Sequence, residues 1–192
     1  MSRRSIVAEQ RGLRPGDAAR ALALASVPLA LVVSDGPSAA AMALAAFGAG
    51  IVRLAGMRPI PDIVTQAVLV GAAWCAALDL YDAIAWLDLA VHLASGVVLA
   101  LLCHALLVRS GMLQEGDRRR DGWARALHVT NAVLLLGLLW ELGEWAGHVG
   151  IDAGIGVGYE DTLSDLVADV LGAVAAAAVL ERRALLGRGR RR

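Results

Sequence analysis

The chain has 192 residues, of which 58% are hydrophobic and 4% aromatic, and its mean hydropathy is +0.62. Soluble domains average about 45–50% apolar residues, whereas the apolar residues here form long blocks with few charges, so the composition favours an integral membrane protein over a soluble domain. The 18 basic residues, all arginine, equal the 18 acidic ones, and no folded basic module accompanies the arginine runs, so we expect no binding to nucleic acid.

Six apolar blocks follow one another along the chain. A spanning helix needs about 20 residues, and only helices or closed barrels satisfy the backbone polar groups in lipid. The blocks lack the alternation of strands. The sequence therefore predicts an all-α polytopic membrane protein with six transmembrane helices, at about 19–35, 38–56, 60–80, 84–108, 125–148 and 162–183.

The first block also has features of a signal peptide, because small residues that resemble a cleavage site follow its apolar core. The segment before it is long for the start of such a peptide, so we expect a retained helix. The chain then divides into a cytoplasmic N-terminal segment, a six-helix transmembrane domain and a basic C-terminal tail, at 1–18, 19–183 and 184–192.

The arginines predict the orientation of the helices. With six helices and a cytoplasmic N-terminus, every arginine falls on the cytoplasmic side, as the positive-inside rule expects. Adding or removing one helix would distribute the arginines over both faces. We therefore expect both termini in the cytoplasm, a solvated basic loop at 109–124, and a weak ion pair between Asp62 and Arg53 or Arg58 at the inner interface.

Carboxylates and histidines are concentrated near the outer ends of the last three predicted helices. Residues three or four apart share one face of a helix. At 1.5 Å per residue, the three helices offer side chains at two matching depths, roughly 6 Å and 10–12 Å below the outer boundary. The shallow set is Asp88, Glu144 and Asp165, and the deeper set is His92, Glu141 and Asp169.

Helix capping is an alternative role for some of these side chains. Asp88 lies near a helix N-terminus, where the helix dipole favours an anion, and Asp161 or Thr162 could cap the last helix. Capping does not explain Glu141 and Glu144, which lie near a helix C-terminus where the dipole disfavours anions. The deeper residues are beyond the reach of any helix end.

A buried carboxylate usually pairs with a cation, but the predicted topology puts no arginine on the outer side. Burying unpaired charge costs several kcal/mol per ion, so a bound metal, protonation with a proton relay, or a water-filled cavity must neutralise the cluster. Mixed carboxylate and imidazole side chains at these spacings suit a divalent ion in a helix bundle. We expect a metal site with the ligands Asp88, His92, Glu141, Glu144, Asp165 and Asp169.

Three motifs resemble the YjdF-like family of bacterial inner-membrane proteins. They are "DLAVHLASG" from Asp88, "ELGEW" from Glu141 and "DTLSDLVADVLGA" from Asp161. They occur in the order and at the spacing of that family over residues 80–175, and the chain is more loosely similar to VanZ-like membrane proteins. Leu87 stands where the family has a tyrosine, and His148 lies outside the pattern. The resemblance implies a multi-pass protein of the bacterial inner membrane and supplies no reaction.

Two functional classes follow. The first is a metal-dependent membrane hydrolase or transferase that acts on a lipid or envelope precursor, with the ion polarising a phosphoryl or acyl oxygen and Glu144 as general base. The second is a proton- or cation-coupled transporter, or an ion-binding protein without catalysis. A transporter should continue its polar path inward, but the inner half is nearly all apolar, which favours a site open on one side. The expected partners are membrane lipids and a lipid-linked substrate.

Overall fold

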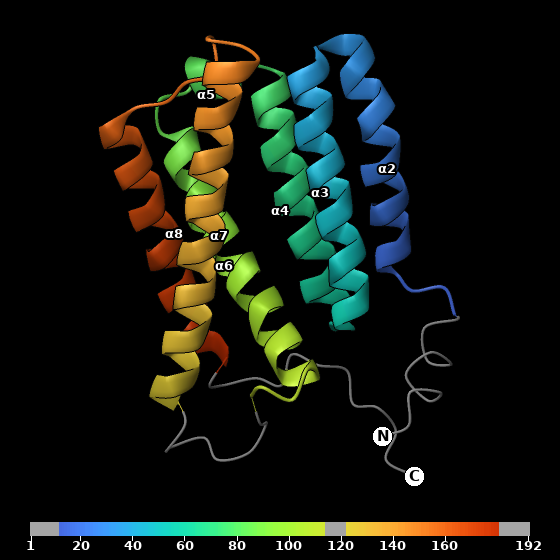
Figure 1. Cartoon of the computed structure of the whole chain (residues 1–192). Helices are drawn as coiled ribbons and strands as arrows, with labels where there is room; N and C mark the ends of the chain where they lie inside the picture. Colours follow the sequence, from blue (N-terminus) through green and yellow to red (C-terminus); the bar gives the residue numbers. More distant parts are fainter. Residues whose placement is uncertain (1–11, 114–121, 181–192) are drawn as a thin grey trace.

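The computed structural model describes residues 12–113 and 122–180, and these ranges form helices and turns without a strand. The helices are α2 (Gly16–Val33), α3 (Gly36–Ala55), α4 (Pro59–Ala77), α5 (Leu80–Ala83), α6 (Leu87–Arg109), α7 (Gly122–Gly150) and α8 (Tyr159–Leu180) (Figure 1). The all-α prediction is confirmed, and each of the six long helices begins within three residues of its expected start. The arginine run of the basic loop and the tail at 184–192 lie outside the described residues.

The long helices present an apolar surface that suits lipid. Five helices of the described part, α2, α3, α4, α6 and α7, are long and apolar enough to cross a membrane. Their outward side chains include exposed leucines on every one of these helices except α4, where isoleucine and valine are exposed. The protein is therefore a multi-pass membrane protein. Helix α8 carries acidic residues in its first half and packs against α6 and α7.

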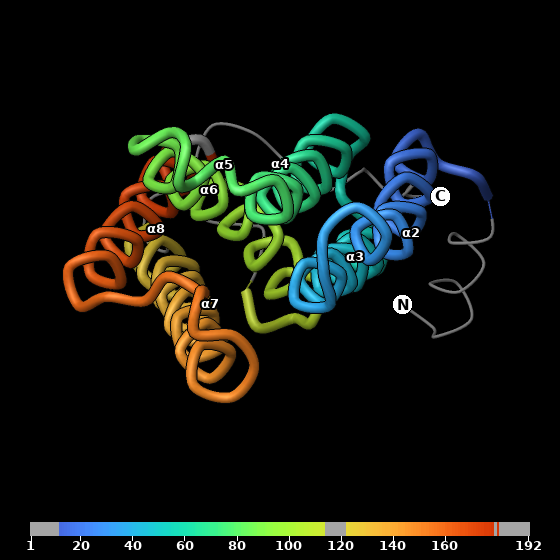
Figure 2. Tube along the Cα trace, turned by 90° about the horizontal axis from the view of Figure 1, so that it is seen from above, coloured from blue at the N-terminus to red at the C-terminus, as the bar shows by residue number. Residues whose placement is uncertain are grey.

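Helix α6 joins two groups of helices. Helices α2, α3 and α4 pack together on one side, α7 and α8 lie on the other, and α6 contacts α4 as well as α7 and α8 (Figure 2). The start of α6, the end of α7 and the start of α8 lie at the upper end of the bundle in Figure 1, and α2, α4 and α7 begin at the lower end. This up-and-down arrangement brings the three acidic helix ends together.

The turns around α3 show why the first helices form a tight hairpin. Asp35 caps the start of α3 by accepting a hydrogen bond from the backbone N–H of Ser38 at 2.7 Å, and hydrogen bonds from Ser38 lower the pKa of Asp35. Helix α3 ends at Gly56, whose φ of 68° lies in the left-handed region that glycine adopts readily. Both ends of α3 are thus fixed by local sequence.

The short helix α5 between α4 and α6 was not predicted. It follows Asp79, which has a left-handed φ of 53°, and the hydroxyl of Tyr81 donates to the backbone carbonyl of Ala72 at 3.0 Å. Burial raises the pKa of Tyr81. The turn is therefore anchored to α4, and it sets where α6 begins.

A buried ion pair connects the starts of α2 and α4. Arg20 Nη2 donates to Asp62 Oδ1 at 2.6 Å, Arg20 Nη1 donates to Asp17 Oδ1 at 2.8 Å, and Gln66 Nε2 donates to the same oxygen of Asp62 at 2.6 Å. Asp62 is 2% exposed and Arg20 is 8% exposed. We expected a weak pair of Asp62 with Arg53 or Arg58 at the inner interface. The structure corrects this expectation, because Asp62 is buried and pairs with Arg20 of the first helix.

Replacing Asp62 with asparagine is expected to lower the free energy of unfolding by about 3 kcal/mol. The change leaves the Arg20 guanidinium buried without its main countercharge. Breaking a buried ion pair costs about 3–5 kcal/mol, and we expect a cost at the low end of this range because Asp17 still faces Arg20. Thermal unfolding of the detergent-solubilised protein measures this. Asp79→Asn is the matched control, because Asp79 is exposed and asparagine tolerates its left-handed backbone. Equal unfolding midpoints for the two variants would contradict the prediction.

Helices α6 and α8 approach each other closely at two glycines. A Cβ atom at Gly96 would overlap the backbone carbonyl of Asp169, and one at Gly172 would overlap that of Leu93. Small residues allow membrane helices to approach in this way. Because Gly96 lies one turn after His92, the contact presses the polar face of α6 against that of α8.

Candidate metal centre

The first half of the site comes from the start of α6. Asp88 lies in the first turn of this helix and His92 lies one turn later, so both side chains share one face. His92 Nε2 is 3.8 Å from Asp88 Oδ1. The helix begins after Trp86, and no side chain caps it; the Asp88 carboxylate is directed toward His92 instead.

The second half comes from α8, which supplies Asp165 and Asp169 one turn apart. Asp165 Oδ2 lies 3.9 Å from His92 Nε2, and Asp169 Oδ2 lies 3.5 Å from His92 Nδ1. Each nitrogen of the imidazole therefore faces a carboxylate of α8. One ligand atom from each of Asp88, His92 and Asp165 lies within 4.8 Å of the other two, so these three side chains form a group of the size that one ion requires.

Several polar atoms of this group are buried without a partner. Asp165 and Asp169 are each 3% exposed. Among the described residues, Asp165 Oδ1, Asp169 Oδ1 and His92 Nδ1 have no hydrogen-bond partner. An unsatisfied buried polar atom costs about 1–3 kcal/mol. His92 Nδ1 already faces Asp169 Oδ2 at 3.5 Å, so the two carboxylate oxygens are the buried atoms that point to a ligand which the described side chains do not provide.

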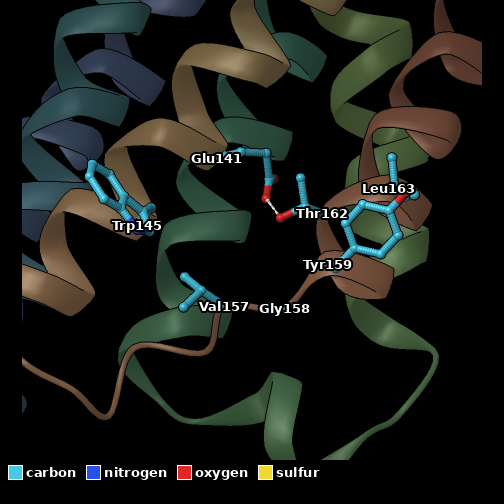
Figure 3. Close-up of a pocket in the computed structure, with 7 residues that line it drawn as sticks. All are labelled: Glu141, Trp145, Val157, Gly158, Tyr159, Thr162 and Leu163. Carbon is cyan, nitrogen blue, oxygen red and sulfur yellow. Dashed lines mark hydrogen bonds between the residues drawn. The ribbon is translucent and has the colours of Figure 1, made fainter.

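Helix α7 places Glu141 beside this group. Glu141 is 7% exposed, and its Oε2 accepts a hydrogen bond from Thr162 Oγ1 of α8 at 2.8 Å (Figure 3). Its other oxygen, Oε1, is buried without a partner in the described part of the chain. The capping role considered for Thr162 is wrong, because α8 begins at Tyr159 and the threonine hydroxyl binds α7 instead.

Glu144 lies one turn after Glu141 and is half-buried. It is close enough to interact electrostatically with Glu141, His92 and Asp88. The structure thus brings Asp88, His92 and Asp165 together, sets Asp169 against the imidazole, and places both glutamates of α7 beside them. His148, which lies outside the family pattern, faces the carbonyl of Ile155 at 2.7 Å.

The arginines of the described helices lie at the other end of the bundle. Asp88 lies at the start of the 23-residue helix α6 and Arg109 at its end, so roughly 30 Å separates them at 1.5 Å per residue. Arg20 and Arg53 lie at the same end as Arg109, where they pair with Asp17. His92 is the basic side chain that pairs with the acidic cluster in the described ranges.

Sequence reasoning missed the contribution of Gly137. A Cβ atom at this position would lie 2.6 Å from Asp169 Oδ2 and 3.1 Å from Leu166 Cδ2. The glycine on α7 therefore leaves room for the Asp169 carboxylate. A signal was present in the sequence, because Gly137 lies four residues before Glu141 and so on the same face of α7.

A bundle of apolar helices with acids and a histidine buried together at one end defines a multi-pass membrane protein with a candidate ion site. The chain belongs to the family described as "Predicted membrane protein (DUF2238)", which matches residues 22–185. This is the YjdF-like family that the three motifs indicated. No curated protein and no solved structure matches the chain.

Proposed function

We propose that the protein holds a divalent metal ion between α6 and α8 and acts as a metal-dependent hydrolase or transferase on a lipid or envelope precursor. The observation that carries the proposal is the group of Asp88, His92 and Asp165, whose ligand atoms lie within 4.8 Å of one another. The unpartnered buried oxygens of Asp165 and Asp169 support it.

The distances in this group fit an ion with little rearrangement. Two ligands bound at 2.0–2.2 Å can lie at most about 4.4 Å apart, and the separations of His92 Nε2 from Asp88 and from Asp165 are 3.8 and 3.9 Å. A set of one imidazole and several carboxylates suits zinc, manganese or iron better than calcium, which prefers oxygen alone.

Asp169 has a different role in this proposal. Its Oδ2 lies 3.5 Å from His92 Nδ1, the nitrogen that faces away from Asp88 and Asp165. A metal-bound histidine commonly donates its other N–H to a carboxylate, which fixes the orientation of the ring. Asp169 therefore orients His92 so that Nε2 points into the ligand group, and Gly137 keeps space for the carboxylate that does so.

The proposed membrane topology has α8 as a sixth spanning helix, with both termini in the cytoplasm of a bacterial cell. The support is the separation of charge along the bundle. Arg20, Arg53 and Arg109 lie at the end opposite to the cluster, and the positive-inside rule would put that end in the cytoplasm. The cluster then lies in the outer half of the inner membrane.

In the proposed reaction, Glu144 is the general base. It is half-buried, lies one turn from Glu141 and is outside the group of three ligands, so it is free to accept a proton from a water molecule. A divalent ion in the site would polarise a phosphoryl or acyl oxygen of the substrate. Glu141 is held by Thr162 and helps to keep the site negative enough to retain the ion.

The packing beneath the cluster favours an enzyme over a transporter. The next layer toward the arginine end contains Ala100, Val129, Val133, Ala173 and Ala176, which form one buried apolar cluster. In the described helices α6, α7 and α8, this layer blocks a polar path from the acids to the opposite face. A transporter for protons or cations needs such a path.

Elemental analysis of the purified protein tests the proposal. We expect about one divalent ion per chain, removal of this ion by a chelator, and about 2.7 kcal/mol of stabilisation when ion is returned at 100 times its dissociation constant. Glu160→Gln is the control, because Glu160 is an exposed carboxylate on the same helix α8 and should leave the metal content unchanged. Metal-free, folded protein that zinc, manganese and iron fail to stabilise would contradict the proposal; proton or cation flux in liposomes would then support the transporter.

A further inference from the structure

A pocket of about 360 Å³ lies between the outer ends of α7 and α8, beside the candidate metal centre. Figure 3 shows Trp145 of α7 and Tyr159 of α8 on either side of it. Its lining residues are Glu141, Trp145, Val157, Gly158, Tyr159, Thr162 and Leu163. Apart from Glu141 and Thr162, these residues offer an apolar or aromatic surface, and the volume lies within the range of about 300–1,000 Å³ that is usual for small-molecule sites.

The pocket opens at an exposed and largely apolar surface near the outer ends of α7 and α8. Trp145 is 58% exposed and Leu163 is 44% exposed, although both lie on helices of the membrane domain. Tryptophan and tyrosine are enriched at the level of lipid headgroups, which places the mouth near the boundary between the acyl chains and the headgroups. A surface of this kind suits the apolar part of a membrane molecule.

Glu141 belongs both to this pocket and to the acidic cluster. The hydrogen bond between Thr162 Oγ1 and Glu141 Oε2, at 2.8 Å, forms the polar wall of the pocket (Figure 3). Glu141 Oε1 is buried and unpartnered among the described residues, and the carboxylate interacts electrostatically with His92 and Asp169. A ligand in the pocket thus has its polar end beside Glu141, on the side of the acidic cluster.

We propose that this pocket binds the upper part of an acyl chain of a membrane lipid with a phosphate headgroup, and that the phosphate lies at the metal centre. The proposal rests on the proposed function, because carboxylates alone would repel a phosphate and the divalent ion supplies the attraction. The apolar lining accounts for the chain, and the shared Glu141 accounts for the position of the headgroup.

Lipid binding to the delipidated full-length protein tests this proposal, with native mass spectrometry as the measurement and metal content determined on the same preparation. The probes are dioleoylphosphatidic acid and dioleoylglycerol, which have the same chains and differ in the phosphate. We expect one tightly bound phosphatidic acid per chain and binding of dioleoylglycerol that is weaker by about tenfold or more. Removing the metal with a chelator should abolish this difference.

Leu163→Trp fills the pocket and should weaken the binding of phosphatidic acid by about tenfold. Leu171→Trp is the matched control, because Leu171 is an exposed leucine of the same helix that does not line the pocket. Equal binding of phosphatidic acid by the two variants, or equal binding of the two lipids by the metal-loaded protein, would overturn the pocket proposal while leaving the metal proposal intact. Wild-type protein that fails to bind added zinc, manganese or iron and shows no preference for phosphatidic acid would overturn both.

Discussion

Replacing Gly172 with leucine is expected to separate α6 from α8 and to leave little folded protein. Even a Cβ atom at this position overlaps the backbone carbonyl of Leu93, and a backbone atom cannot turn away as a side chain can. Overpacking of a core costs about 1–3 kcal/mol and occasionally more. Because a whole helix must move here, we expect about 3 kcal/mol or more, which lowers the unfolding midpoint by about 6–12 °C in a chain of this size.

Size-exclusion chromatography and thermal unfolding in detergent measure this effect. Gly71→Leu is the matched control, because Gly71 lies on α4 with open space where its Cβ would be, so the added side chain should project into lipid or detergent at no cost. Gly172→Ala should fall between the two variants. If Gly172→Leu unfolds at the same temperature as Gly71→Leu, the close approach of α6 and α8 is wrong, and the site that depends on it is wrong as well.

The helices were predictable because their length and apolar content are set by the thickness of a bilayer. This requirement located the starts of α2, α3, α4, α6, α7 and α8 within three residues. It could not predict α5, which is a single turn held by a left-handed Asp79 and by the hydrogen bond of Tyr81 to α4. Nor could it find the buried pair of Arg20 and Asp62, because residues 42 positions apart meet only through tertiary packing.

The sequence indicates which residues of the candidate site share a helix face, but it does not indicate which of them contact one another across helices. Helical spacing shows that Asp88 and His92 share one face, and that Asp165 and Asp169 share another. It does not show that these two faces meet. The contact follows from Gly96 and Gly172, which the sequence marks only as small residues. For the same reason the hydrogen bond from Thr162 to Glu141, which joins α7 to α8, could not be distinguished from a helix cap.

Replacing Asp165 with asparagine is expected to change stability in opposite directions with and without metal. The amide keeps the shape of the side chain but removes a charged ligand from the group of Asp88, His92 and Asp165, so stoichiometric metal should be lost. In the metal-free protein the same change removes one of several buried like charges, and the repulsion among them falls. The metal-free variant should therefore unfold at a higher temperature than the metal-free wild type.

Elemental analysis and thermal unfolding with chelator or added metal measure both effects, and Glu160→Gln, on the exposed side of α8, should show neither. This pair of signs separates neutralisation by a bound metal from neutralisation by protons or by water. If a metal neutralises it, the variant is less stable than wild type with metal present and more stable without it. If protonated carboxyls neutralise it, an amide replaces a neutral acid, metal has no effect, and the two midpoints coincide. If water fills the cavity and screens the charges, the metal-free variant and the metal-free wild type unfold at nearly the same temperature. Added metal then stabilises neither protein.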